Sequence, residues 1–174
     1  MIVLIVGDFG VGKDTVADLL LSQSLTHKSN SYSFQKILSY ATRKPRYEGE
    51  DTHIFTSKEE FLKFDDLVAC TKIDDNYYGA RFSQFDTEKI NLYCVDDKGV
   101  SDIIDKNIDD VFIVEVIRPK WLRNVSNMRL ARKRESGSFK YNPDYIILND
   151  KDLFNLEISV SDCFNAILKY SEEL

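Results

Sequence analysis

The chain has 174 residues, 43% of them hydrophobic, which is enough to bury one sizeable core within a single domain. Its formal net charge of -6 argues against binding to nucleic acid polymers, because such proteins carry a basic excess that neutralises phosphates. The three cysteines are widely spaced and indicate neither a disulfide framework nor a zinc site, so a reducing cytoplasm fits best. No apolar run approaches the length of a membrane span.

The chain begins with a pattern typical of a strand, a glycine-rich loop and a helix. Residues 1–6 are apolar and follow no basic stretch, so they predict a buried strand and not a secretory signal. Residues 7–13 contain three glycines and a lysine, and residues 14–21 have the apolar spacing of an amphipathic helix. This order of elements is typical of the start of an α/β fold.

The loop after the first strand has the spacing of a phosphate-binding loop. In the pattern G-x-x-x-x-G-K, backbone N–H groups turn inward around phosphate oxygens, while Lys13 neutralises charge on the β and γ phosphates. The following helix points its positive end at the same place. The alternative is a glycine turn with an incidental lysine. The predicted ATP-binding residues here are Gly7, Gly10, Val11, Gly12, Lys13, Asp14 and Thr15.

The position after Lys13 departs from the consensus, which has a serine or threonine hydroxyl for Mg²⁺. This position is Asp14, and Thr15 follows it. Because a carboxylate can hold the metal through water, Asp14 and Thr15 are candidate Mg²⁺ ligands. In the alternative interpretation, Asp14 is only a first-turn residue that the helix dipole favours.

Short apolar runs and helical stretches alternate later in the chain. The expected strands are residues 91–95, 111–117 and 145–148, and the expected helices are residues 98–106, 120–135 and 153–170. The alternation predicts a three-layer α/β fold of the P-loop NTPase type with a parallel central sheet. Residues from about 31 to 90, with a helix expected over 57–64, are interpreted as an insertion that covers the site. We therefore expect one domain over 1–174, with its core in 1–30 and 91–174.

A basic cluster over residues 39–46 lies in this insertion. Its sequence, Ser-Tyr-Ala-Thr-Arg-Lys-Pro-Arg, places Arg43 and Arg46 beside hydroxyl groups, which suits bidentate capture of a phosphate. A cluster of this kind is otherwise usually a solvated surface. Together with the phosphate loop, it predicts a second phosphate site.

With these motifs, the chain resembles the guanylate kinase family. In that family, an insertion binds the monophosphate. Along the chain, this insertion contains a serine, Thr-Arg-x-x-Arg, a glutamate-containing turn, an aromatic residue with a helix, and Asn-Tyr-Tyr-Gly. The matching pieces here are Ser39, Thr42 to Arg46, Glu50, Phe55 to Phe61, and Asn76 to Gly79. Residues 95–99 and 143–150 also resemble later strands of the family, so the resemblance covers nearly the whole chain.

The resemblance implies phosphoryl transfer from Mg-ATP to a nucleoside monophosphate, with GMP or dGMP as the leading acceptor. The residues implied to hold the acceptor phosphate are Ser39, Arg43, Arg46 and Tyr78. Asp96 would lie at the monophosphate, near the metal or the base, and is a further candidate Mg²⁺ ligand. Asn149 would lie near the adenine of ATP.

Four positions depart from the family's pattern. The family's guanine-reading glutamate falls on Ala69, and the serine after its glycine falls on Ala80. A tyrosine that touches phosphate becomes His53, and the first aspartate of the strand near Asp96 becomes Cys94. Because a site that hydrogen-bonds guanine discriminates through buried polar groups, their loss relaxes or changes the preference. A deoxynucleotide with another base, or a non-nucleotide phosphate, therefore stays open as the acceptor.

Seven cations crowd residues 118–135 of an otherwise acidic chain. Phosphoryl transfer spreads charge over the transferring oxygens, and a lid that bears arginines would stabilise this charge and exclude water. The family's lid is longer, and Arg129 and Arg132 are the candidates here. The alternative is a solvated helix whose cations face Glu135 and neighbouring acids.

The catalytic candidates are thus Lys13, Arg43, Arg129 and Arg132. The acceptor is already an anionic oxygen, so positioning and charge balance replace a general base. The alternative from another class is an inactive, guanylate kinase-like interaction module. Such modules usually degrade the phosphate loop, which is complete here. We expect a cytoplasmic enzyme that binds ATP and a nucleoside monophosphate, without nucleic acid polymers or membranes.

Overall fold

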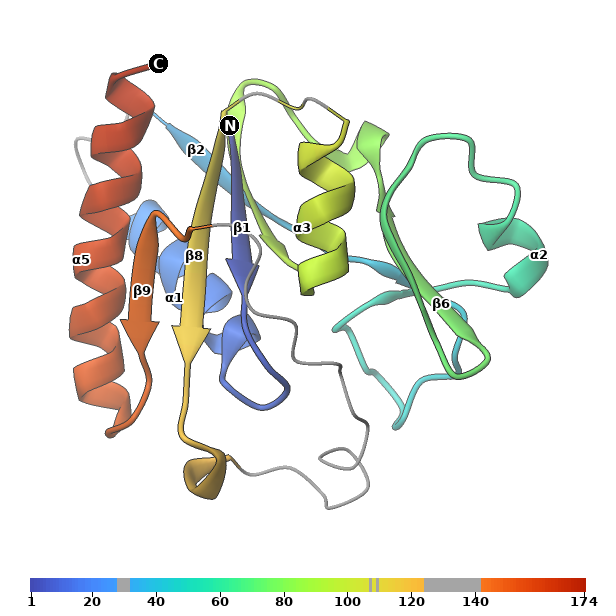
Figure 1. Ribbon diagram of the computed structural model, residues 1–174, viewed down its shortest axis with the longest axis horizontal. Helices are drawn as coiled ribbons and strands as arrows, with labels where there is room; N and C mark the ends of the chain where they lie inside the picture. Colours follow the sequence, from blue (N-terminus) through green and yellow to red (C-terminus); the bar gives the residue numbers. More distant parts are fainter. Residues whose placement is uncertain (28–31, 107, 109, 124–141) are drawn as a thin grey trace.

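The computed structural model describes residues 1–27, 32–106, 108, 110–123 and 142–174 (Figure 1). The helices are α1 (Lys13–Thr26), α2 (Lys58–Phe61), α3 (Asp97–Ile104) and α5 (Leu153–Glu172). The strands are β1 (Ile2–Val6), β2 (Ser33–Ile37), β3 (Tyr40–Ala41), β4 (Ile54–Phe55), β5 (Leu67–Ile73), β6 (Asn76–Arg81), β7 (Lys89–Cys94), β8 (Val111–Ile117) and β9 (Tyr145–Leu148). Phe82–Gln84 and Lys120–Leu122 form single 3₁₀ turns.

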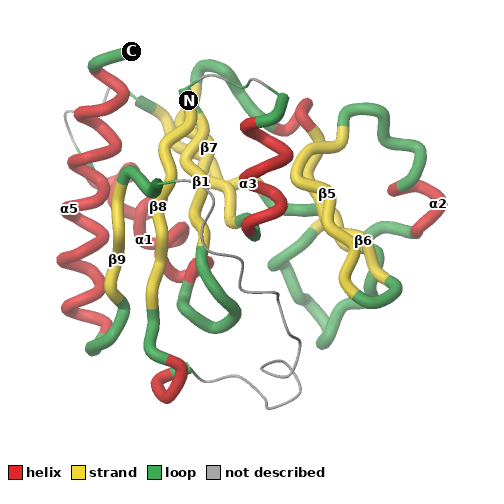
Figure 2. The backbone as a smooth tube through the Cα atoms, in the orientation of Figure 1, coloured by secondary structure: helices red, strands yellow, loops and turns green. Residues whose placement is uncertain are grey.

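Five parallel strands form the central sheet in the order β2-β7-β1-β8-β9 (Figures 1 and 2). The centre is β1, whose side chains alternate between two cores. Val3 and Ile5 pack with residues of α1 and α5, whereas Leu4 and Val6 pack with residues of α3. This alternation follows from the two-residue period of a strand, and it requires apolar residues on both faces. The predicted three-layer fold with a parallel sheet is confirmed.

A second sheet of four strands, in the order β4-β3-β6-β5, lies beside the central sheet on the side of α3. Its pairs β3–β6 and β5–β6 are antiparallel, and β3–β4 is parallel. The strand β2 falls inside the range 31–90 that sequence analysis assigned to the insertion, but it pairs with β7 in the central sheet. The inserted part of the chain therefore begins after Ile37, because β2 belongs to the core.

The predicted helix over 57–64 is shorter in the structure. Ser57 and Glu60 form a reciprocal capping box at the start of α2, and Phe61 is fully buried. Beyond Phe61, the amides of Lys63 and Phe64 donate to carbonyls only three residues back. The segment therefore tightens into turns instead of extending the helix.

The predicted helix over 120–135 and the predicted lid fall mostly outside the described residues, and so do Arg129 and Arg132. In the part that is described, only the short turn at Lys120–Leu122 is helical. None of the described helices combines the length and apolar character that crossing a membrane requires.

Candidate functional site

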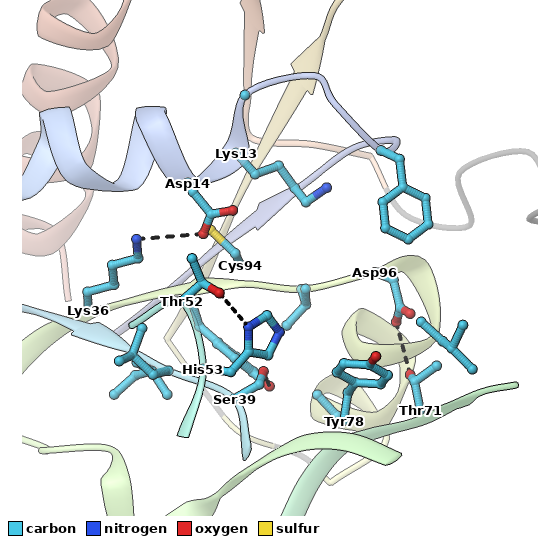
Figure 3. A pocket seen from close by; sticks show the side chains of 18 of the residues that line it. Lys13, Asp14, Lys36, Ser39, Thr52, His53, Thr71, Tyr78, Cys94 and Asp96 are labelled. Carbon is cyan, nitrogen blue, oxygen red and sulfur yellow. Dashed lines mark hydrogen bonds and ion pairs between the residues drawn. The ribbon is translucent and has the colours of Figure 1, made fainter. Parts of the chain in front are cut away.

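A cavity of about 470 Å³ lies between the phosphate loop and the second sheet (Figure 3). The loop and the start of α1 form one wall, with Gly10, Gly12, Lys13, Asp14 and Thr15. The facing wall comes from the end of β2, the second sheet and the end of β7, with Ser39, Arg46, His53, Thr71, Tyr78, Cys94 and Asp96. The two predicted phosphate sites therefore share one cavity.

Four predicted residues, Gly7, Val11, Arg43 and Asn149, are not part of the lining that the described residues form. Gly7 lies against β8. A methyl group on its Cα would lie 2.3 Å from the carbonyl oxygen of Val116, and its φ is +140°. Only glycine therefore fits at Gly7.

We expect Gly7→Ala to lower the free energy of unfolding by about 3 kcal/mol or more and to weaken ATP binding, because the loop must move away from β8. Gly49→Ala is the matched control, since Gly49 also has a positive φ, +81°, but a methyl group on its Cα would meet no atom within 4 Å. Gly49→Ala should lower the free energy of unfolding by only about 1–2 kcal/mol, through backbone strain. Thermal and urea unfolding of both variants, with ATP titrations, would measure the difference. Equal losses would contradict the steric argument.

Lys13 and Asn149 hold the loop in shape. The Lys13 ammonium donates to the carbonyl oxygens of Gly7 at 2.7 Å and Asp8 at 2.9 Å, so it reaches across its own loop. The buried Asn149 donates to the Val11 carbonyl at 2.8 Å and accepts from Arg118 at 2.7 Å. Asn149 thus links the end of β9 to the phosphate loop, and its predicted place near adenine stays a prediction.

Asp14 faces the cavity from the first turn of α1. Its side chain is 67% exposed, and one carboxylate oxygen lies 3.6 Å from the ammonium of Lys36 on β2. Asp96 lies at the other end of the same cavity. Among the described residues, no group of three histidine, cysteine or acidic side chains forms a metal site. The exposed carboxylate of Asp14 beside the phosphate loop nevertheless fits Mg²⁺, which keeps several waters and takes its other ligands from substrate phosphates.

The facing wall carries the predicted monophosphate site. Ser39, Arg46, Tyr78 and Asp96 all line it. The hydroxyl groups of Ser39 and the buried Tyr93 are 3.0 Å apart. Asp96 caps α3 by accepting from the Gly99 amide at 2.8 Å, and it also accepts from the Thr71 hydroxyl at 3.3 Å. These contacts hold the side chains of Ser39 and Asp96 in position in this wall.

Glu50, which the sequence analysis named as part of the family-like motif and not as a site residue, contacts two of the predicted site residues. Its carboxylate is 1% exposed and accepts two hydrogen bonds from Arg43, at 2.6 and 2.9 Å, in a bidentate pair. It also accepts from the Arg46 backbone amide at 2.6 Å and from the Thr52 hydroxyl at 2.8 Å. The Arg43 guanidinium and these donors hold the pKa of Glu50 far below its usual range. Glu50 therefore orients both arginines, a role that its place in the family-like motif between Arg46 and Phe55 could have suggested.

Comparisons with known proteins agree with this arrangement. No family model matches the chain. A guanylate kinase from Mycoplasmopsis pulmonis is 29% identical over 91% of this chain and 85% of its own length. A guanylate kinase from Mycoplasmoides gallisepticum is 28% identical over 99% of this chain and 94% of its own length. A crystal structure of guanylate kinase from Anaplasma phagocytophilum matches 97% of this chain and 84% of its own with a TM-score of 0.65, at 22% identity.

The chain is similar in sequence to these two guanylate kinases over most of its length. It shares the fold of the Anaplasma phagocytophilum structure, and the predicted resemblance to guanylate kinases is confirmed. The roles of individual side chains in this guanylate kinase-like site stay predictions.

The part of the cavity where the resemblance places the base lacks the family's two polar groups, as the sequence indicates. Ala69 lines the cavity and Ala80 is fully buried. A methyl group on Gly99 would lie 3.0 Å from the Cβ of Ala69, so α3 packs closely on this part of β5. Thr71 and Asp96 are the neighbouring polar side chains that line this region.

Cys94 is another position in the cavity wall that departs from the family's pattern. Burial, with Asp14 as the next cause, raises the pKa of its thiol to about 12, so Cys94 is neutral at pH 7. It therefore supplies none of the negative charge that an aspartate would bring beside Lys13 and Lys36.

Proposed function

We propose that the chain transfers the γ-phosphoryl group of Mg-ATP to GMP or dGMP. The observation that carries this proposal is one cavity with the phosphate loop and Lys13 on one wall and Ser39, Arg46 and Tyr78 on the other. The names of the two similar sequences, both guanylate kinases, support it. The reaction draws on cytoplasmic nucleotides, which fits the three free cysteines.

The donor side of the reaction follows from the loop. The amides of the loop and the N-terminus of α1 would bind the phosphates of ATP, and Lys13 would leave the carbonyls of Gly7 and Asp8 to pair with the β and γ phosphates. Asp14 and Thr15 would hold Mg²⁺, directly or through water. When bound, Mg²⁺ neutralises charge on the β and γ phosphates.

The acceptor side follows from the charge of the facing wall. Arg46, with Arg43 behind it, would orient the acceptor phosphate so that one of its oxygens lies in line with the γ phosphorus. That oxygen is already anionic, so no side chain has to remove a proton. The chain's contribution is therefore positioning and positive charge. Thr71 and Asp96, which line the cavity, would be the polar side chains that meet the base.

The test is ADP release from Mg-ATP with GMP, dGMP, AMP, CMP, UMP, dTMP and dCMP as separate acceptors. We expect GMP and dGMP to give a kcat/KM about tenfold above that of AMP, because Thr71 and Asp96 would still meet the base although Ala69 and Ala80 replace the family's glutamate and serine. A Lys13→Ala preparation made in the same way controls for contaminating kinases. Preference for another base would contradict the guanine assignment, and absence of stimulation by every nucleotide would contradict the enzyme class.

A further inference from the structure

His53 lies in the wall of the cavity, between the Glu50 turn and β4. Arg46, Thr52 and Tyr78 line the cavity with it, and Figure 3 places its ring between Thr52 and Tyr78. The ring meets Tyr78 edge-on with 5.7 Å between ring centroids. The side chain therefore faces the region where the acceptor phosphate is proposed to bind.

A chain of hydrogen bonds fixes which ring nitrogen carries the proton. The Thr52 hydroxyl has a single proton, and it donates this proton to Glu50 at 2.8 Å. The same hydroxyl oxygen lies 3.0 Å from Nδ1 of His53, so it can only accept from that nitrogen. Nδ1 therefore carries the proton of the neutral ring, and Nε2 carries the lone pair.

A neutral ring in this tautomer cannot donate to a phosphate through Nε2, because two lone pairs would meet. The charged groups that act on the ring are Arg43 and Arg46 from its own turn, Glu50, and Asp14 from α1. Burial, followed by the two arginines, lowers the pKa of His53, while Asp14 and Glu50 raise it by less. Before a ligand binds, the ring is therefore neutral at pH 7.

We propose that His53 is a ligand of the acceptor phosphate that binds it as an imidazolium, so that binding of the monophosphate takes up a proton at Nε2. The proton comes from solvent, Nε2–H then donates to a phosphate oxygen, and Nδ1–H stays on Thr52. The dianion offsets the charge of Arg43 and Arg46, which otherwise disfavours protonation. This inference rests on the proposed function.

The coupling has a defined dependence on pH. Binding raises the pKa of His53, so the contribution of the imidazolium to affinity is present below the pKa of the free protein. This contribution is lost as the pH rises through the higher pKa of the complex. A ring that only packs against Tyr78 would show neither proton uptake nor this loss.

The test is calorimetric titration of GMP at pH 7.5 in two buffers with different ionisation enthalpies, which counts the protons taken up. The phosphate of GMP itself titrates near pH 6, so the informative quantity is the difference between proteins. We expect His53→Asn to lose most of the uptake and to bind GMP about tenfold more weakly, because a hydrogen bond to a charged group is lost. His27→Asn is the matched control, since His27 follows α1 and does not line the cavity. It should match the wild type.

A second variant separates ligand binding from folding. His53→Tyr can donate to phosphate without titrating near neutral pH, so we expect near wild-type affinity at pH 7.5, no extra proton uptake, and little change in affinity up to pH 9. Equal uptake in the wild type and His53→Asn would overturn the proposal. If the wild type binds no GMP, the proposed function fails, and the same titration with inorganic phosphate decides on His53. If binding of inorganic phosphate takes up a proton in the wild type but not in His53→Asn, the proposal stands. Any other result would overturn it.

Discussion

Lys13→Ala lowers kcat for phosphoryl transfer by about 10³-fold or more in our expectation, which corresponds to about 4 kcal/mol of transition-state stabilisation. Its ammonium is held by the carbonyls of Gly7 and Asp8, so it is already positioned over the loop. Without the Lys13 ammonium, the negative charge that develops on the β and γ phosphates is no longer neutralised by this cation. Steady-state ADP release with saturating GMP would measure the loss.

Lys169→Ala is the control for this experiment. Lys169 lies in the last turn of α5, away from the cavity lining, so its removal should leave kcat within about twofold. Thermal unfolding should show that both variants remain folded. A folded Lys13→Ala protein that keeps more than about a tenth of the wild-type kcat would remove the phosphate loop from the mechanism.

Glu50→Gln should lower kcat/KM for GMP by about 100-fold while leaving KM for ATP unchanged. The carboxylate holds Arg43 through two hydrogen bonds and the Arg46 amide through a third. Glutamine has nearly the same shape but one carbonyl oxygen and no charge, so it cannot keep the bidentate pair. Both arginines would then lose their orientation toward the acceptor phosphate, whereas the ATP side would be untouched.

Glu48→Gln is the matched control for Glu50, because Glu48 lies in the same turn and is exposed. It removes the same charge from the turn without touching the arginines, so its kinetics should remain close to wild type. If the two variants lost the same activity, net charge and not orientation would be responsible. If KM for ATP rose together with KM for GMP, the change would have spread beyond the acceptor side.

Local pattern was sufficient for much of the core. The strands β8 and β9 have the predicted bounds, and α5 begins at the predicted residue, because apolar runs with turn residues at their ends specify buried strands and helices by themselves. The phosphate loop was equally readable, since glycine at positions 7 and 12 and lysine at position 13 are required by geometry within a few residues. The parallel sheet followed from the alternation of strands and helices.

Tertiary pairing decided what separated residues do together. The strand β2 joined the central sheet because it pairs with β7, more than fifty residues later in the chain, and its own sequence carries no sign of that partner. The tautomer of His53 depends on a chain of contacts through Thr52 to Glu50, and Glu50 depends in turn on Arg43. The sequence by itself determined the fold class and the phosphate loop, because periodicity and backbone geometry act locally. Only the tertiary structure decided which charges meet across the cavity, because hydrogen bonds and electrostatic forces depend on distances in space.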